Sequence, residues 1–127
     1  MRIIKKEEKI IAIVFDGTFE DGTKPLTPEA WPLQVIALNH PAGKKLVAHS
    51  HCPTTRTTEN LMEALMVFSG VVNVSVYSQN ELIEVVTVRT GQGVMIVDGG
   101  IGIEVIEDAK MMEFKNGPFV EDKVLLE

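Results

Sequence analysis

Short runs rich in valine and isoleucine recur along the whole chain, and they constrain its fold more than any other feature of the sequence. Glycine, proline, asparagine and aspartate separate these runs at turn-forming positions. Many short strands at this spacing predict an all-β sandwich or barrel. The expected strands are residues 9–15, 33–39, 45–51, 61–70, 71–78, 82–88, 93–98, 102–107, 110–115 and 122–127.

Residues 71–78 carry the clearest strand pattern, because Val72, Val74 and Val76 alternate with polar or small side chains. Successive side chains of a strand point to opposite faces, so one face of this strand is expected to lie in the core. The run 61–70 also suits a helix, but it leads directly into this strand, which favours an extended conformation. Residues 27–31 suit one helical turn at most, which Pro32 ends.

Length and charge limit the class of protein. A chain of 127 residues is expected to form one domain, covering residues 1–127, with a core of its own. The net charge is −6 and no block of lysine and arginine stands out, which argues against a nucleic-acid partner.

A reducing, cytoplasmic location is expected, because the single cysteine, Cys52, excludes an internal disulfide. Cys52 itself is expected to be a small buried residue. The N-terminus has no signal-peptide pattern, and no run reaches the ~20 apolar residues that a membrane helix needs.

Two of the three histidines lie one residue apart, at His49 and His51. In a strand these positions point to the same face, so both imidazoles are expected to project together. Such a pair can bind a divalent metal or share acid–base work. A pair of polar residues on a wet sheet face is the structural alternative.

The spacing around this pair resembles the first motif of the cupin family. Gly43 precedes His49 by five intervening residues, and Glu63 precedes Gly70 by six. The resemblance implies a cupin-type double-stranded β-helix, which is a jelly-roll barrel, with His49, His51 and Glu63 around a divalent metal. In the second family motif, the position of a third histidine falls on Gly102, or on Ile101 after a shift of one residue.

The C-terminal segment resembles the tail of small cupins found among sugar-epimerase-like and polysaccharide-biosynthesis proteins. This likeness rests on Lys115, Gly117, Pro118, Phe119, Asp122 and Lys123. It implies a small sugar-like or carboxylate ligand. Arg56 and Tyr77 are the candidate ligand-binding residues, because a guanidinium pairs with carboxylate or phosphate and a strand tyrosine can line a cavity.

Three functions are consistent with these features. In the first, the barrel holds a divalent metal on the two histidines and Glu63 and acts on or binds a small ligand. In the second, His49 or His51 performs metal-free acid–base catalysis, as in sugar isomerases and epimerases of this fold. In the third, the chain is a non-catalytic dimeric cupin with a degenerate site. A homodimer is expected in any case, since cupins are commonly dimeric.

Overall fold

A computed structural model describes residues 1–126 of the chain, and these residues form strands, turns and loops without any helix. The all-β prediction is therefore confirmed. None of the described residues belongs to a helix that could cross a membrane. The eight strands are β1 (Arg2–Lys6), β2 (Lys9–Phe15), β3 (Gly22–Pro25), β4 (Ile36–Asn39), β5 (Glu63–Ser78), β6 (Glu81–Arg89), β7 (Gly93–Ile96) and β8 (Gly100–Lys115).

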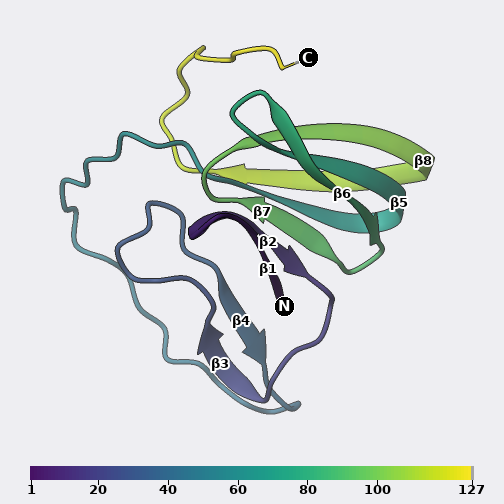
Figure 1. Cartoon of the computed structure of the whole chain (residues 1–127). Helices are drawn as coiled ribbons and strands as arrows, with labels where there is room; N and C mark the ends of the chain where they lie inside the picture. Colours follow the sequence, from purple (N-terminus) through teal and green to yellow (C-terminus); the bar gives the residue numbers. More distant parts are fainter. Residues whose placement is uncertain (127) are drawn as a thin grey trace.

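Six of these strands form one curled antiparallel sheet that resembles half a barrel (Figure 1). The strand order is β1-β2-β7-β5-β6, and β8 pairs with β5. The curl brings β1 and β6 close together. Ion pairs join the two strands, between Arg2 and Glu84 at 2.5 Å and between Lys6 and Glu81. Strands β3 and β4 form a separate hairpin.

The long strand β5 organises the sheet. It pairs with β8 along nearly its whole length, while its other side pairs first with β7 and then with β6. The change of neighbour falls at Gly70, whose φ of +93° suits glycine. A Cβ atom at this position would lie only 2.2 Å from the carbonyl oxygen of Asp108. Glycine is therefore required both by the backbone conformation and by the close approach of β8.

The core consists of two apolar clusters on the two faces of the sheet. The larger lies inside the curl and includes Val72, Val74 and Val76, all 0% exposed. Their burial confirms the alternation expected for residues 71–78. The smaller cluster lies on the other face and is covered by Trp31 and neighbouring apolar side chains; its buried members are Ile13, Met62, Ala64 and Met95.

Residues 27–31, which the sequence allowed at most one helical turn, form a tight turn and no helix, and the amide of Trp31 donates to the carbonyl of Pro28 at 3.1 Å. The side-chain amide of Gln34 donates to the carbonyls of Pro28 and Trp31, at 2.9 and 2.7 Å. Gln34 thus satisfies carbonyls that a continuing helix would have used. This turn places Trp31 over the smaller cluster.

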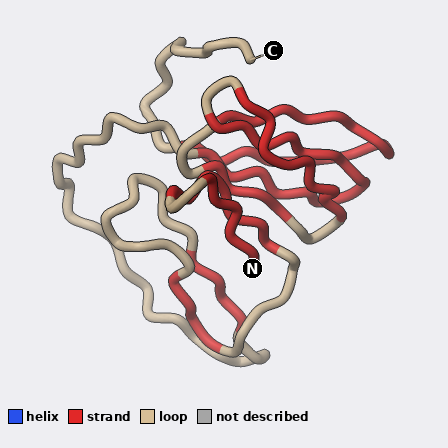
Figure 2. The backbone as a smooth tube through the Cα atoms, in the orientation of Figure 1, coloured by secondary structure: helices blue, strands red, loops and turns tan. Residues whose placement is uncertain are grey.

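Residues 45–51 were expected to form a strand, and this prediction is wrong. The segment belongs to a long loop, residues 41–62, that runs outside the sheet and has no strand partner (Figure 2). Its apolar residues are not buried in a core, since Leu46 is 54% and Val47 is 85% exposed. An extended segment is a strand only when a neighbour accepts its backbone hydrogen bonds, and none of residues 1–126 does so here.

The remaining strand predictions differ from the structure mainly in their ends. Residues 9–15 are confirmed without change. Strand β5 joins the two predicted strands 61–70 and 71–78, and β8 joins the predicted strands 102–107 and 110–115. The predicted strand 33–39 is shorter in the structure, where it is β4. Residues 122–126 form no strand, while residue 127 lies outside the described residues. Strands β1 and β3 were missed, because β1 has only the pair Ile3–Ile4 among charged residues and β3 has no large apolar residue.

Candidate functional site

The two neighbouring histidines lie in the loop formed by residues 41–62, which we call the histidine loop. Every residue from 41 to 61 is exposed, and only Met62, at the end of the loop, is buried. Asn116 holds this end, because its side chain accepts from the amide of Met62 at 2.7 Å and donates to the carbonyl of Asn60 at 3.1 Å. The loop is thus anchored at its junction with β5, and the histidines lie well before that anchor in the sequence.

His49 and His51 lie side by side although the segment is not a strand. Their ring centres are 5.1 Å apart and the ring planes are nearly perpendicular, at 82°. Two imidazoles bound to one tetrahedral zinc ion at about 2.0–2.1 Å per nitrogen have ring centres about 5 Å apart. The separation therefore matches that of a two-histidine chelate.

A backbone contact fixes the tautomer of His49. Its Nδ1 lies 2.9 Å from the carbonyl oxygen of Val47. A carbonyl can only accept, so Nδ1 carries the proton and the neutral ring keeps its lone pair on Nε2. Histidines that bind metals are commonly oriented by such a contact from the second ring nitrogen.

Glu63, the predicted third ligand, takes part in a different cluster. It begins β5, its side chain is 17% exposed, and its Oε2 lies 3.6 Å from the ammonium of Lys115. The same ammonium lies 3.5 Å from Glu113. Residues 1–126 contain no group of three or more histidine, cysteine, aspartate or glutamate side chains placed to hold a metal. The structure therefore brings the two histidines together, and pairs Glu63 with Lys115.

Burial raises the pKa of Glu63, and the nearby negative charge of Glu113 raises it further, while Lys115 acts in the opposite direction. The folded chain then holds this proton to a higher pH than the unfolded chain does. Stability consequently falls as the pH rises from the ordinary glutamate value of 4.5 through the raised folded value.

We expect Glu63→Gln to become more stable relative to the wild type as the pH rises through this range, because the variant has no carboxylate to desolvate. Urea unfolding of both proteins, below the ordinary glutamate pKa and at about pH 7, measures the difference. In a Glu113→Gln background the pH dependence should shrink, since one cause of the shift is gone. A stability difference that does not change with pH would contradict this account.

The other predicted site residues do not join the histidines in one cluster. Arg56 lies in the histidine loop, where its guanidinium donates to the carbonyl of Thr54 at 3.3 Å. Tyr77 lies on β5, with its ring against Gly102. Gly102 and Ile101, the positions that correspond to a third histidine, are paired on β8 with Ser75 and Val76. Neither can supply an imidazole.

The prediction that Cys52 is buried is wrong, since its side chain is exposed in the histidine loop. The prediction failed because it assumed that residues 45–51 form a strand, with Cys52 directed away from the histidines. Without a sheet there is no opposite face to bury it. The third histidine, His40, follows the end of β4, and its Nε2 lies 2.9 Å from the hydroxyl of Thr23.

A shallow pocket of about 370 Å³ lies where the end of the histidine loop meets the sheet. Its volume falls within the range of small-molecule sites. One of its carboxylates, on Asp98, is ion-paired with Lys9 at 2.7 Å. The pocket is lined by Glu8, Ile10, Trp31, Pro32, Asn60, Met62, Val97 and Asp98.

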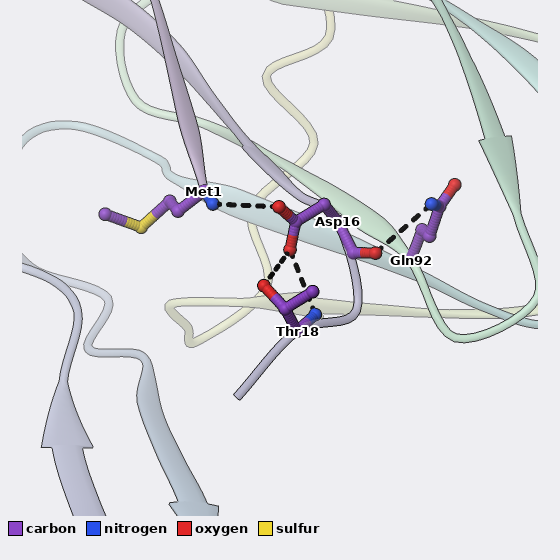
Figure 3. Close-up of polar contacts among 4 residues, drawn as sticks. All are labelled: Met1, Asp16, Thr18 and Gln92. Carbon is purple, nitrogen blue, oxygen red and sulfur yellow. Dashed lines mark hydrogen bonds and ion pairs between the residues drawn. The ribbon is translucent and has the colours of Figure 1, made fainter. Parts of the chain in front are cut away.

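A polar cluster that sequence reasoning missed surrounds Asp16, at the end of β2 (Figure 3). Its carboxylate accepts from the hydroxyl and the amide of Thr18, at 2.6 and 2.9 Å, and from the N-terminal ammonium at 3.2 Å. These donors, the Thr18 hydroxyl first, hold the pKa of Asp16 well below its usual range. Gln92 donates to the Asp16 carbonyl at 3.2 Å. The cluster fastens the N-terminus and the β6–β7 turn to β2, and the spacing of aspartate and threonine is its only sequence signal.

The fold and the site together define a class: an all-β protein whose curled antiparallel sheet carries a long exposed loop with an oriented histidine pair. Comparisons with known protein families, with curated proteins and with solved structures gave no match for this chain.

Proposed function

We propose that this chain is a small cupin-like protein that binds a divalent cation through His49 and His51 and uses that site to bind or act on a small sugar-like or carboxylate ligand. The observation that carries the proposal is the geometry of the pair. The ring centres are separated by 5.1 Å, close to the separation of about 5 Å for two imidazoles on one tetrahedral cation. The contact from His49 Nδ1 to Val47 leaves Nε2 free to coordinate.

The donor set suits a borderline-soft cation such as Zn²⁺, because neutral imidazole is its common nitrogen ligand. A cation held by two imidazoles keeps open positions, where it can polarise a ligand oxygen as a Lewis acid. Glu63 is the proposed third ligand. To reach the cation, its carboxylate has to exchange Lys115 for the metal.

Two further features of the histidine loop support a small ligand. Arg56 lies on the histidine loop and offers a guanidinium for a carboxylate or phosphate group. The pocket at the end of the loop includes Asn60, and its Trp31 supplies an apolar surface. The histidine loop thus contributes Asn60 and Met62 to this pocket, and the other lining residues come from outside the loop.

The test is cation binding by the tag-free full-length protein, measured by titration calorimetry with Zn²⁺ alone and by metal analysis after purification. We expect about one equivalent in the wild type and a loss of affinity of at least about 100-fold in His49→Ala and His51→Ala. His40→Ala is the matched control, since it removes the only other imidazole, which contacts Thr23 instead. It should bind like the wild type.

Glu63→Gln distinguishes a site that includes Glu63 as the third ligand from a site that consists of the two histidines alone. If Glu63 is the third ligand, this variant loses about 10- to 100-fold in affinity; if the pair acts without it, affinity stays within about twofold. A wild type that binds Zn²⁺ no better than the variant lacking both histidines would contradict the proposal. The metal-free acid–base function expected from the sequence would then be the alternative to test.

A further inference from the structure

The strand β8 has an unpaired outer edge. It pairs with β5 on one side, and no strand among residues 1–126 lies along its other side. The two end strands of the sheet differ from it, because ion pairs join β1 to β6 across the opening of the curl. The unpaired N–H and C=O groups of an edge strand are a template for pairing with another chain.

The two halves of β8 differ in their protection. Charged side chains are the usual protection of an edge, and residues 107–115 carry five of them: Glu107, Asp108, Lys110, Glu113 and Lys115. The first half, Gly100–Val105, has one, at Glu104. This half is therefore the part of the edge that is open to pairing.

The first half also presents apolar side chains that continue the core. Ile101, Ile103 and Val105 lie opposite Val76, Val74 and Val72 of β5, which are fully buried. Of these edge positions, Ile103 is 40% and Val105 is 53% exposed. An additional strand beside β8 would add one more set of apolar side chains to the inner face of the sheet.

We propose that the edge formed by Gly100–Val105 is the seam of a homodimer, in which the β8 strands of two copies pair antiparallel about a two-fold axis through Ile103. The sequence of the edge is self-complementary in this register. Ile103 lies opposite Ile103 of the other copy, and Ile101 lies opposite Val105. The carboxylate of Glu104 lies opposite Gly102, so that no like charges face each other across the seam.

The charge pattern of β8 favours this register of self-pairing over other registers. Registers centred in the second half of β8 give no comparable match: an axis at Glu107 sets two carboxylates opposite each other, and an axis at Met112 sets Lys110 opposite Phe114. Like charges directly opposite each other destabilise a strand pair. Only the Gly100–Val105 segment combines an apolar inner row with a single, well-separated charge.

The oligomeric state of the full-length chain tests the seam, measured by sedimentation velocity and by light scattering after size exclusion. We expect a dimer in the wild type. In Ile103→Lys two ammonium groups would meet at the axis, so the dimer dissociation constant should rise by at least about 100-fold and the measured mass should halve. Ile36→Lys is the matched control, because Ile36 lies on β4 and is 52% exposed, and it should remain dimeric.

A milder pair of variants covers the case in which Ile103→Lys fails to fold. In a Cys52→Ser background, Ile103→Cys should give a covalent dimer on oxidation, because residue 103 lies opposite itself, and Ile36→Cys should not. A monomeric wild type would overturn the proposal. A dimer that survives Ile103→Lys, or that fails to cross-link through residue 103, would overturn it as well, because the seam would then lie elsewhere.

Discussion

Replacing Gly70 by alanine should lower the free energy of unfolding by about 3 kcal/mol or more. Two costs add at this position. The φ of +93° is one that a residue with a Cβ rarely adopts. The new Cβ would also lie 2.2 Å from the carbonyl oxygen of Asp108, so that β5 and β8 would have to separate where β5 changes neighbours. Urea unfolding followed by circular dichroism measures the loss.

Gly91→Ala is the matched control for this prediction. Gly91 has a similar φ, +83°, but no atom lies within 4 Å of its added Cβ. It should therefore cost only the conformational strain, about 1 kcal/mol. Equal losses in the two variants would show that the close approach of β8 at Gly70 has no energetic consequence.

Leu65→Ala should destabilise the protein by about 2–5 kcal/mol. Leu65 is 2% exposed and belongs to the larger core cluster inside the curl. Its cross-strand neighbours Val94 and Glu113 belong to β7 and β8, so the truncated side chain would leave a cavity at the junction of three strands. Because a well-packed interior relaxes only in part, the cost includes this cavity in addition to the lost transfer free energy.

The same substitution at Leu125, which is 86% exposed in the C-terminal segment, should change stability by no more than about 0.5 kcal/mol. Thermal and urea unfolding of both variants would compare them directly. A loss at Leu65 below about 1 kcal/mol would contradict the assignment of this cluster as the core of the sheet.

Gly70→Ala and Leu65→Ala both change the sheet, whereas the proposed cation site lies in a loop outside it. A fully folded His51→Ala protein that has lost the cation would therefore separate function from stability. The exposure of residues 41–61 makes this separation possible, because removing an exposed imidazole leaves no cavity. The proposed seam at β8 is equally distinct, since it depends on neither histidine.

The class of fold and the positions of several strands could be predicted because they are local properties of the chain. Residues 9–15 form β2 as expected, and Val72, Val74 and Val76 are all buried, since alternation alone sets which face of a strand is apolar. The joining of separate predicted runs into β5 and β8 could not be predicted in this way. It depends on register shifts near Gly70, where the two strands pair with each other.

In the candidate site, too, the features set by local sequence could be predicted and those set by tertiary contacts could not. The proximity of His49 and His51 follows from their separation of one residue, and it holds even though the expected strand does not form. The surroundings of Glu63 do not follow from any spacing, because Lys115 and Glu113 reach it only through the register of β5 against β8. The exposure of Cys52 was likewise decided by the absence of a neighbouring strand.

An all-β chain with a close histidine pair could therefore be predicted from the sequence, since both features are set by residues within a few positions of one another. Three features became visible only in the folded chain: the pair lies on an open loop, Glu63 is ion-paired with Lys115, and the first half of β8 is an apolar edge with a single charge. These features depend on contacts between residues far apart in the chain. Such contacts are chosen by the packing of the whole sheet and not by any local preference.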